Sequence, residues 1–146
     1  MPNFNDAEIT AIYVSHRSSA GVQDDAPNAP TAGDRFDVTL EMVAGYALDT
    51  SKYTLTVSCA DLTAWKPAPA SMIPSTAAFA KASTFGGTGW KPVGPGPLYY
   101  AFENSETVNT TKPFGGDDHV YQYTVSLVNA SGQVVSIKQS DEFVLI

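Results

Sequence analysis

The sequence predicts an all-β protein, built as an antiparallel sandwich of about seven short strands. Apolar residues alternate with polar residues at a period of two in one segment after another, which is the pattern of strands with one buried face. Turn-forming residues separate these segments, and almost no stretch has the period of a helix. A chain of 146 residues can bury one sizeable hydrophobic core, so we expect a single domain over residues 1–146.

Seven segments carry the strand pattern, and they are residues 8–15, 34–42, 53–59, 98–102, 121–127, 133–137 and 143–146. The second of these is the clearest, because Phe36, Val38, Leu40 and Met42 fall on one face and polar residues on the other. A short turn over residues 129–132 predicts that the fifth and sixth segments form a hairpin.

Two stretches depart from the strand pattern. Residues 16–33 are polar and predict a long surface loop. Residues 61–97 form a longer insertion, with both tryptophans, five glycines and six of the ten prolines. Within it, residues 75–82 could form two helical turns, with Ser75 as the N-cap. Because long loops in compact domains are usually functional or disordered, and this one is rich in aromatic residues, we expect it to carry function.

Charge and composition exclude several classes of protein. The formal charge is −7, with eight cationic side chains scattered along the chain, which argues against a nucleic-acid partner. No apolar run reaches the length of a transmembrane segment. The single cysteine, Cys59, cannot form an intramolecular disulfide, and its place in the strand pattern predicts that it is buried. No signal peptide is visible at the first residues, so the sequence leaves the compartment open between cytoplasmic as encoded and secreted, either as a mature form or by a non-classical route.

Catalytic and metal-binding patterns are weak in this sequence, and we expect a protein that is not an enzyme and needs no cofactor. The only histidines are His16 and His119, and neither lies in a sequence motif for nucleophilic catalysis. Asp117, Asp118 and His119 are weak candidates for metal ligands, because carboxylates and an imidazole lie in one loop. The preceding Gly-Gly and the paired aspartates are more typical of an ordinary turn, which is the interpretation we favour.

The segment Tyr121-x-Tyr123-x-Val125-x-Leu127-x-Asn129-x-x-Gly132 resembles the penultimate strand and following hairpin of fibronectin type III and related immunoglobulin-like domains. The resemblance covers residues 121–132 and implies an immunoglobulin-like sandwich, in which Tyr121 is a buried tyrosine whose hydroxyl bonds to nearby backbone. The core tryptophan and the disulfide of antibody domains have no counterpart here.

The insertion contains the tripeptide Trp-Lys-Pro twice, at residues 65–67 and 90–92, and Tyr99 follows shortly after. Flat aromatic rings are enriched at recognition surfaces, and loops on a rigid sandwich commonly carry binding residues. We therefore expect a non-enzymatic recognition module for a glycan or a protein. Its expected ligand-binding residues are Trp65, Lys66, Trp90, Lys91 and Tyr99. An equally weighted alternative is that the two tryptophans cover an open end of the core.

Two other functions remain open from the sequence. A self-assembling structural protein or homo-oligomer fits the low charge, the threonine-rich strand faces and the apolar residues 143–146, which would be an edge liability unless paired. A small toxin or effector acting on a membrane or receptor is a third possibility, supported only by the aromatic content and the lack of a visible enzyme site.

Overall fold

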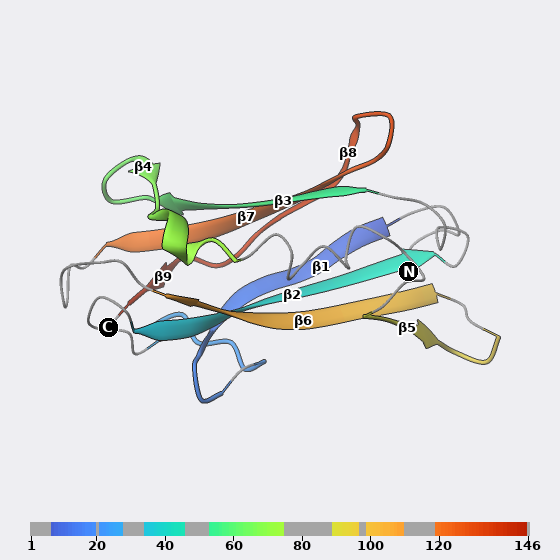
Figure 1. Cartoon of the computed structure of the whole chain (residues 1–146), viewed down its shortest axis with the longest axis horizontal. Helices are drawn as coiled ribbons and strands as arrows, with labels where there is room; N and C mark the ends of the chain where they lie inside the picture. The colour runs from blue at the N-terminus through green and yellow to red at the C-terminus, as the bar shows by residue number, and fades with distance from the viewer. Residues whose placement is uncertain are drawn as a thin grey trace.

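A computed structural model describes residues 7–19, 21–27, 34–45, 53–74, 89–96, 99–109 and 119–145. The chain forms two antiparallel sheets stacked as a β-sandwich (Figure 1). One sheet has four strands in the spatial order β1 (Ala7–His16), β2 (Arg35–Gly45), β6 (Tyr99–Asn109) and β5 (Trp90–Val93). These two sheets confirm the predicted all-β sandwich. The described residues include no helix long and apolar enough to cross a membrane.

The second sheet has five strands. Its spatial order is β4 (Lys66–Pro67), β3 (Thr54–Asp61), β7 (Val120–Val128) and β8 (Val134–Gln139), and β9 (Phe143–Val144) pairs with the beginning of β7. A short 3-10 helix, η2 (Ala70–Met72), follows β4. Every strand pairing described in the two sheets is antiparallel, as the alternating sequence pattern requires.

The core lies between the inward faces of the two sheets. In β2 it receives the four residues that the sequence pattern placed on one face, Phe36, Val38, Leu40 and Met42. The inward residues of β7 are equally well covered, and they are Tyr121, Tyr123, Val125 and Leu127. Cys59 is also buried, as predicted, and burial raises the pKa of its thiol to about 12.

The insertion is more regular than the sequence predicted. It contributes an additional strand to each sheet, β4 to the five-stranded sheet and β5 to the four-stranded sheet. These two strands escaped the sequence analysis because each includes a proline and is too short to show an alternation. The predicted helix over residues 75–82 lies outside the described residues.

The apolar C-terminal segment lies in the core. Phe143 and Leu145 are buried, because β9 pairs with β7 through Val120 and Tyr121. The edge liability that the sequence raised for residues 143–146 is therefore absent from the described part of this segment. Exposed apolar side chains occur instead on β8, at Val134, Val135 and Ile137.

Tyr123 ties the insertion to the core. Its hydroxyl donates a hydrogen bond to the backbone carbonyl of Met72 in η2, and both residues are fully buried. Burial raises the pKa of the Tyr123 hydroxyl well above its usual range, so the group stays a protonated donor. Tyr121, where the immunoglobulin resemblance places a hydroxyl-to-backbone bond, is buried two residues earlier on the same strand.

We predict that Tyr123→Phe destabilises the protein by about 1–3 kcal/mol, because it leaves the buried Met72 carbonyl without its donor. Tyr99→Phe is the control, and it should cost less than about 0.5 kcal/mol because Tyr99 is half-exposed at the start of β6. Urea unfolding of the two variants measures the difference. Equal losses at both positions would contradict this role for Tyr123.

Candidate recognition site

A tight turn between β3 and β4 presents the most exposed aromatic side chain among the described residues. Asp61 pairs with Lys66 across the two strands, and residues 62–65 form the connection, which we call the Trp65 loop. Trp65 itself is 89% exposed. The loop lies at the end of the sandwich where β4 is drawn in Figure 1.

The side chain of Asp61 stabilises this loop through hydrogen bonds to its backbone. Its Oδ1 accepts backbone N–H bonds from Thr63, at 3.1 Å, and from Ala64, at 3.0 Å. Its Oδ2 lies 2.7 Å from Nδ1 of His119, which comes immediately before β7. The carboxylate is only 4% exposed, so water is largely excluded from it. Each of its oxygens instead has a hydrogen-bond partner within the chain.

A second set of bonds connects the loop to β7. The Leu62 N–H donates to the Val120 carbonyl at 2.8 Å, and the Val120 N–H donates to Oγ1 of Thr63 at 2.9 Å. The loop is thus fastened through side chains and backbone to a strand that lies in the centre of its sheet. These bonds restrict the conformations that residues 62–64 can adopt.

The pKa of Asp61 agrees with this set of hydrogen bonds. Burial of the Asp61 side chain is the largest single influence on its pKa, and it acts to raise that pKa. The hydrogen bonds from the Ala64 N–H, His119 and the Thr63 N–H outweigh it and hold the pKa of Asp61 below its usual 3.8. The group is therefore an anion at neutral pH, which suits an acceptor of three hydrogen bonds.

The backbone at Trp65 is strained. Its φ angle is +53°, and every other positive φ in the described part of the chain belongs to a glycine. A bulky residue in this left-handed region is an outlier that costs on the order of 1–3 kcal/mol, and it persists only where the surrounding structure enforces it. The Asp61 bonds supply that enforcement. Such strain concentrates at functional sites.

The second tryptophan has the opposite environment. Trp90 is 7% exposed and packs against Phe102, with ring centroids 5.4 Å apart. It lies on β5, at the other end of the long axis from β4 (Figure 1). The two tryptophans therefore do not form one surface. Trp90 covers the core, and Trp65 faces solvent.

The five expected ligand-binding residues accordingly fall into two groups. Trp65 and the exposed Lys66 stay together at one end. At the other end Trp90 and Lys91 lie on β5, which pairs with β6 where Tyr99 begins that strand. The structure thus separates the two Trp-Lys-Pro tripeptides by the length of the sandwich.

Of the three weak candidates for metal ligands, the structure describes only His119. Asp117 and Asp118 lie outside the described residues, and His119 bonds to Asp61. In the described ranges, no three His, Cys, Asp or Glu side chains gather closely enough to hold a metal ion. Sequence reasoning missed Asp61, which is 58 residues from His119. The one local signal was an aspartate followed by Thr63 at a strand end, a pattern typical of a side-chain-capped turn.

Comparison with protein-family models gives no match, and neither does comparison with curated proteins.

We predict that Asp61→Asn lowers the free energy of unfolding by about 1–3 kcal/mol at pH 7, because the amide replaces a charged acceptor of three bonds. Since the pKa of folded Asp61 lies below 3.8, its stabilisation is fully present above that pH and is lost as the pH falls through the folded value. Urea unfolding between pH 7 and pH 2 should show wild type and variant converging below about pH 4.

Glu142→Gln is the control for this experiment, because Glu142 is exposed at the surface. Its unfolding curves should track those of wild type across the range. A wild-type advantage over Asp61→Asn that stayed constant down to the lowest pH would contradict the assignment.

Proposed function

We propose that the protein is a non-enzymatic recognition module that inserts Trp65 into a pocket on a protein partner. The observation that carries this proposal is the Trp65 loop itself: an exposed tryptophan in a left-handed conformation, on a turn fixed by a buried carboxylate. An isolated exposed tryptophan contributes nothing to the core, and its strained backbone lowers stability. Both costs become understandable if the side chain anchors a partner.

The exposure of the ring favours a protein over a glycan. A sugar-binding platform usually presents one ring face while the other face packs on the protein. At 89% exposure, neither face of Trp65 is covered to that extent. A side chain that projects in this way fits a hollow on the partner, and tryptophan is the residue type most enriched among the dominant contacts of protein interfaces. Lys66 and Pro67, both exposed, flank it and would form the rim.

We also propose that the sandwich has the immunoglobulin-like arrangement. The spatial order β1-β2-β6-β5 corresponds to strands A, B, E and D of that fold, and β3-β7-β8 corresponds to strands C, F and G. Tyr121, buried at the beginning of β7, has the position of the tyrosine that begins strand F. In this architecture, recognition residues lie on loops at the two ends of the sandwich, which is where the Trp65 loop lies.

The test compares wild type with Trp65→Gly in selections against a displayed random-peptide library and in binding to a glycan array. Glycine adopts a positive φ without strain, so Trp65→Gly should be at least as stable as wild type in urea unfolding. We expect it nevertheless to lose all binding to the peptides that wild type selects. Val22→Ala, which shortens another exposed apolar side chain on a different loop, should keep that binding.

The outcomes separate the possible ligands. Binding of selected peptides that survives in Trp65→Gly would overturn the assignment of the site. Trp65-dependent binding confined to glycans would keep the site but replace the protein partner by a carbohydrate. Because stability is measured on the same variants, loss of binding through unfolding is recognised directly.

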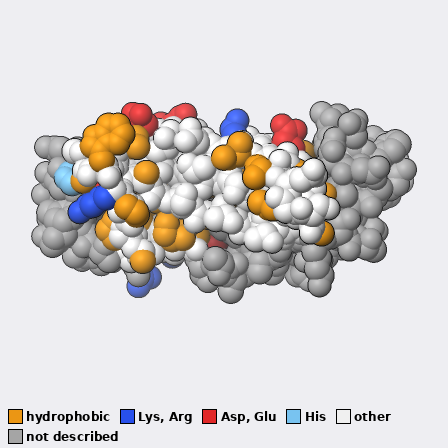
Figure 2. Space-filling model, turned by 90° about the horizontal axis from the view of Figure 1, so that it is seen from above, with side chains coloured by type: hydrophobic (Ala, Val, Ile, Leu, Met, Phe, Trp, Pro, Cys, Tyr) orange, Lys and Arg blue, Asp and Glu red, His pale blue; other side chains and the backbone are white. Residues whose placement is uncertain are grey.

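Self-association is the second candidate function, and β8 is the observation that favours it. This strand lies at the edge of the five-stranded sheet, and Val134, Val135 and Ile137 are exposed on it. The outer face of the same sheet carries few charged side chains (Figure 2). An exposed apolar edge strand is a template for pairing with another chain.

If β8 mediates assembly, light scattering should show a mass that rises with concentration. Ile137→Lys should return the protein to a monomer, because a second cation next to Lys138 opposes edge pairing. A monomer at every concentration of the wild-type protein would eliminate this candidate.

A further inference from the structure

The edge strands β1 and β8 lie next to each other along one side of the sandwich, at a junction that we call the β1–β8 seam. No backbone pairing joins these two strands in the described part of the chain. Side chains bridge the seam instead. The Ile9 N–H donates to Oγ of Ser136 at 3.0 Å, and in the loops that follow the two strands Nε2 of Gln23 donates to Oδ2 of Asp141 at 2.8 Å. A hollow of about 150 Å³ lies along this seam.

The outer edge of β8 carries backbone groups that the chain itself does not pair. The Ser140 N–H, just after β8, donates to the Tyr123 carbonyl of β7 at 2.9 Å. Because alternate residues of a strand direct their backbone groups to opposite sides, Ile137 and Gln139 direct theirs away from β7. Within the described ranges no strand pairs with this side of β8, and no hydrogen bond reaches these backbone groups.

The edge of β1 that faces the seam has unused backbone groups of the same kind. The Val14 carbonyl accepts an N–H bond from Asp24 at 2.9 Å, so the backbone of Val14 faces away from β2. Ile12 precedes Val14 by two residues, and its N–H and carbonyl therefore point to the same side. Ile12 and Gln139 both line the hollow, and no backbone bond joins them across it. The hollow thus lies between two strand edges that can still accept a hydrogen-bonding partner.

Negative charge gathers at one end of the seam. Nε2 of Gln23 donates to the carboxylates of both Asp25, at 3.1 Å, and Asp141, at 2.8 Å, so the two anions lie close together. Neither has an ion pair with a cation among the residues that the structure describes. Lys138 also lines the hollow, but one ammonium against two carboxylates leaves this end with a net negative charge. The formal charge of the whole chain, −7, has the same sign.

We propose that β8 receives an extended segment of a partner protein as an added strand, with a lysine or arginine of that segment held between Asp25 and Asp141. The main chain of the segment bonds to the backbone groups of Ile137 and Gln139, which is how strand addition gains affinity. Its β-branched side chains pack on Val135 and Ile137, which are 40% and 63% exposed. In an antiparallel pairing, the kind found throughout this sheet, the cation lies at the amino-terminal end of the segment.

A second copy of β8 is a poorer occupant of this edge. In an antiparallel pairing of two copies, the beginning of one β8 lies beside the end of the other, and residues 134–136 carry no charge. The carboxylates of Asp25 and Asp141 would stay without a cation in that arrangement. The proposed site is also separate from the Trp65 loop, because β4 and β8 are at opposite edges of the five-stranded sheet.

The probe is the peptide acetyl-Arg-Thr-Val-Thr-Val-Thr-amide, titrated into wild-type protein at a concentration where light scattering shows a monomer. Hydrogen exchange followed by NMR reports each backbone amide separately. We expect saturable binding that slows exchange at Ile137 and Gln139. The amides of Ser136 and Lys138 already face β7 and should change little. No saturable binding, or protection without this alternation, would overturn the proposal.

Two variants test the named contacts. Asp141→Asn should weaken binding of the peptide about tenfold, because it removes one charge-assisted contact to the arginine. Ile137→Pro removes an N–H that has no partner in β7, so the sheet tolerates it, and we expect no binding. Ile137→Thr keeps that N–H and should bind within about threefold of wild type. Circular dichroism checks that each variant is folded. Full affinity in Asp141→Asn or in folded Ile137→Pro would overturn the proposal.

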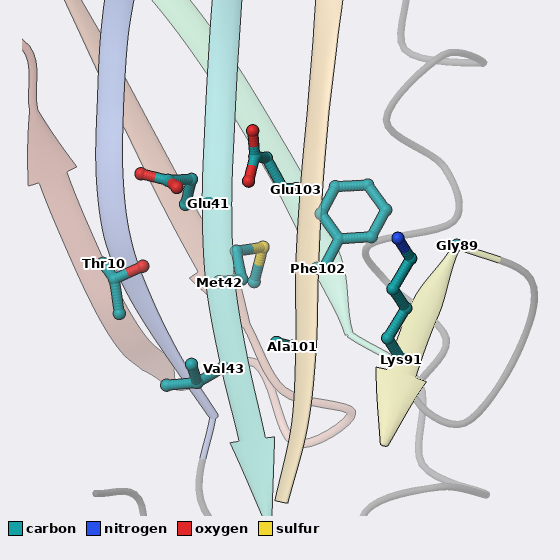
Figure 3. Close-up of a pocket in the computed structure, with 9 residues that line it drawn as sticks. All are labelled: Thr10, Glu41, Met42, Val43, Gly89, Lys91, Ala101, Phe102 and Glu103. Atoms are coloured by element: carbon teal, nitrogen blue, oxygen red, sulfur yellow. The ribbon is translucent and has the colours of Figure 1, made fainter. Parts of the chain in front are cut away.

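Glu103→Gln is the charge control. Glu103 lines a different hollow, of about 250 Å³, on the outer face of the four-stranded sheet, together with Glu41 and Lys91 (Figure 3). It pairs directly with Glu41 across β2 and β6, and like charges directly opposite each other destabilise a sheet. Because Glu103 lies on the other sheet from β8, its removal should leave peptide affinity within about twofold. A loss equal to that of Asp141→Asn would mean that only the overall charge attracts the peptide, and it would overturn the site.

Discussion

Phe143 joins the two sheets, and the order of the remaining structure depends on that contact. Its ring lies 5.8 Å from Phe36 of the four-stranded sheet and 5.4 Å from Tyr123 of the five-stranded sheet, where the two rings are stacked within 11°. To bring Phe143 inward, the chain must leave the line of β8. Ser140 makes this step without breaking the ladder, because its N–H donates to the Tyr123 carbonyl and its hydroxyl accepts from the Tyr123 N–H.

This packing also determines the geometry of the Trp65 loop. Phe143 pairs with Tyr121 at the beginning of β7, and Tyr121 pairs on its other side with Asp61 at the end of β3. The carboxylate that holds the loop therefore starts from a position set by the core. From there, three hydrogen bonds extend the order of the sheet into the turn. The exposed ring of Trp65 thus depends on interactions that begin in the centre of the sandwich.

The sequence was enough to predict the architecture, because apolar residues that alternate with a period of two are typical of strands with one buried face. The burial of Phe36, Val38 and Leu40 followed from their alternation alone. The site was harder to predict, because Trp65 and Trp90 have the same neighbours, Lys and Pro. What separates them is pairing: Trp90 lies opposite Phe102 on β6, whereas Trp65 lies in the turn before β4. A tripeptide does not show which later strand its residues will pair with.

The Asp61–His119 contact escaped sequence analysis for the same reason. Its two members are far apart in the chain and meet only because β3 pairs with β7. The opposition of Glu41 and Glu103 likewise depends on the register between β2 and β6, which the alternation leaves undetermined. In each case the local residue types were ordinary, and only the strand register brought the groups together.

The Trp65 loop and the Glu41–Glu103 pair share one physical property, since each is a locally unfavourable arrangement. A bulky residue occupies a glycine conformation at one, and two like charges face each other at the other. Both features lower stability locally. Both features also lie outside the packed interior, which contains the buried rings of Phe36, Tyr123 and Phe143. The sandwich can therefore carry two locally unfavourable surfaces because its core does not depend on either of them.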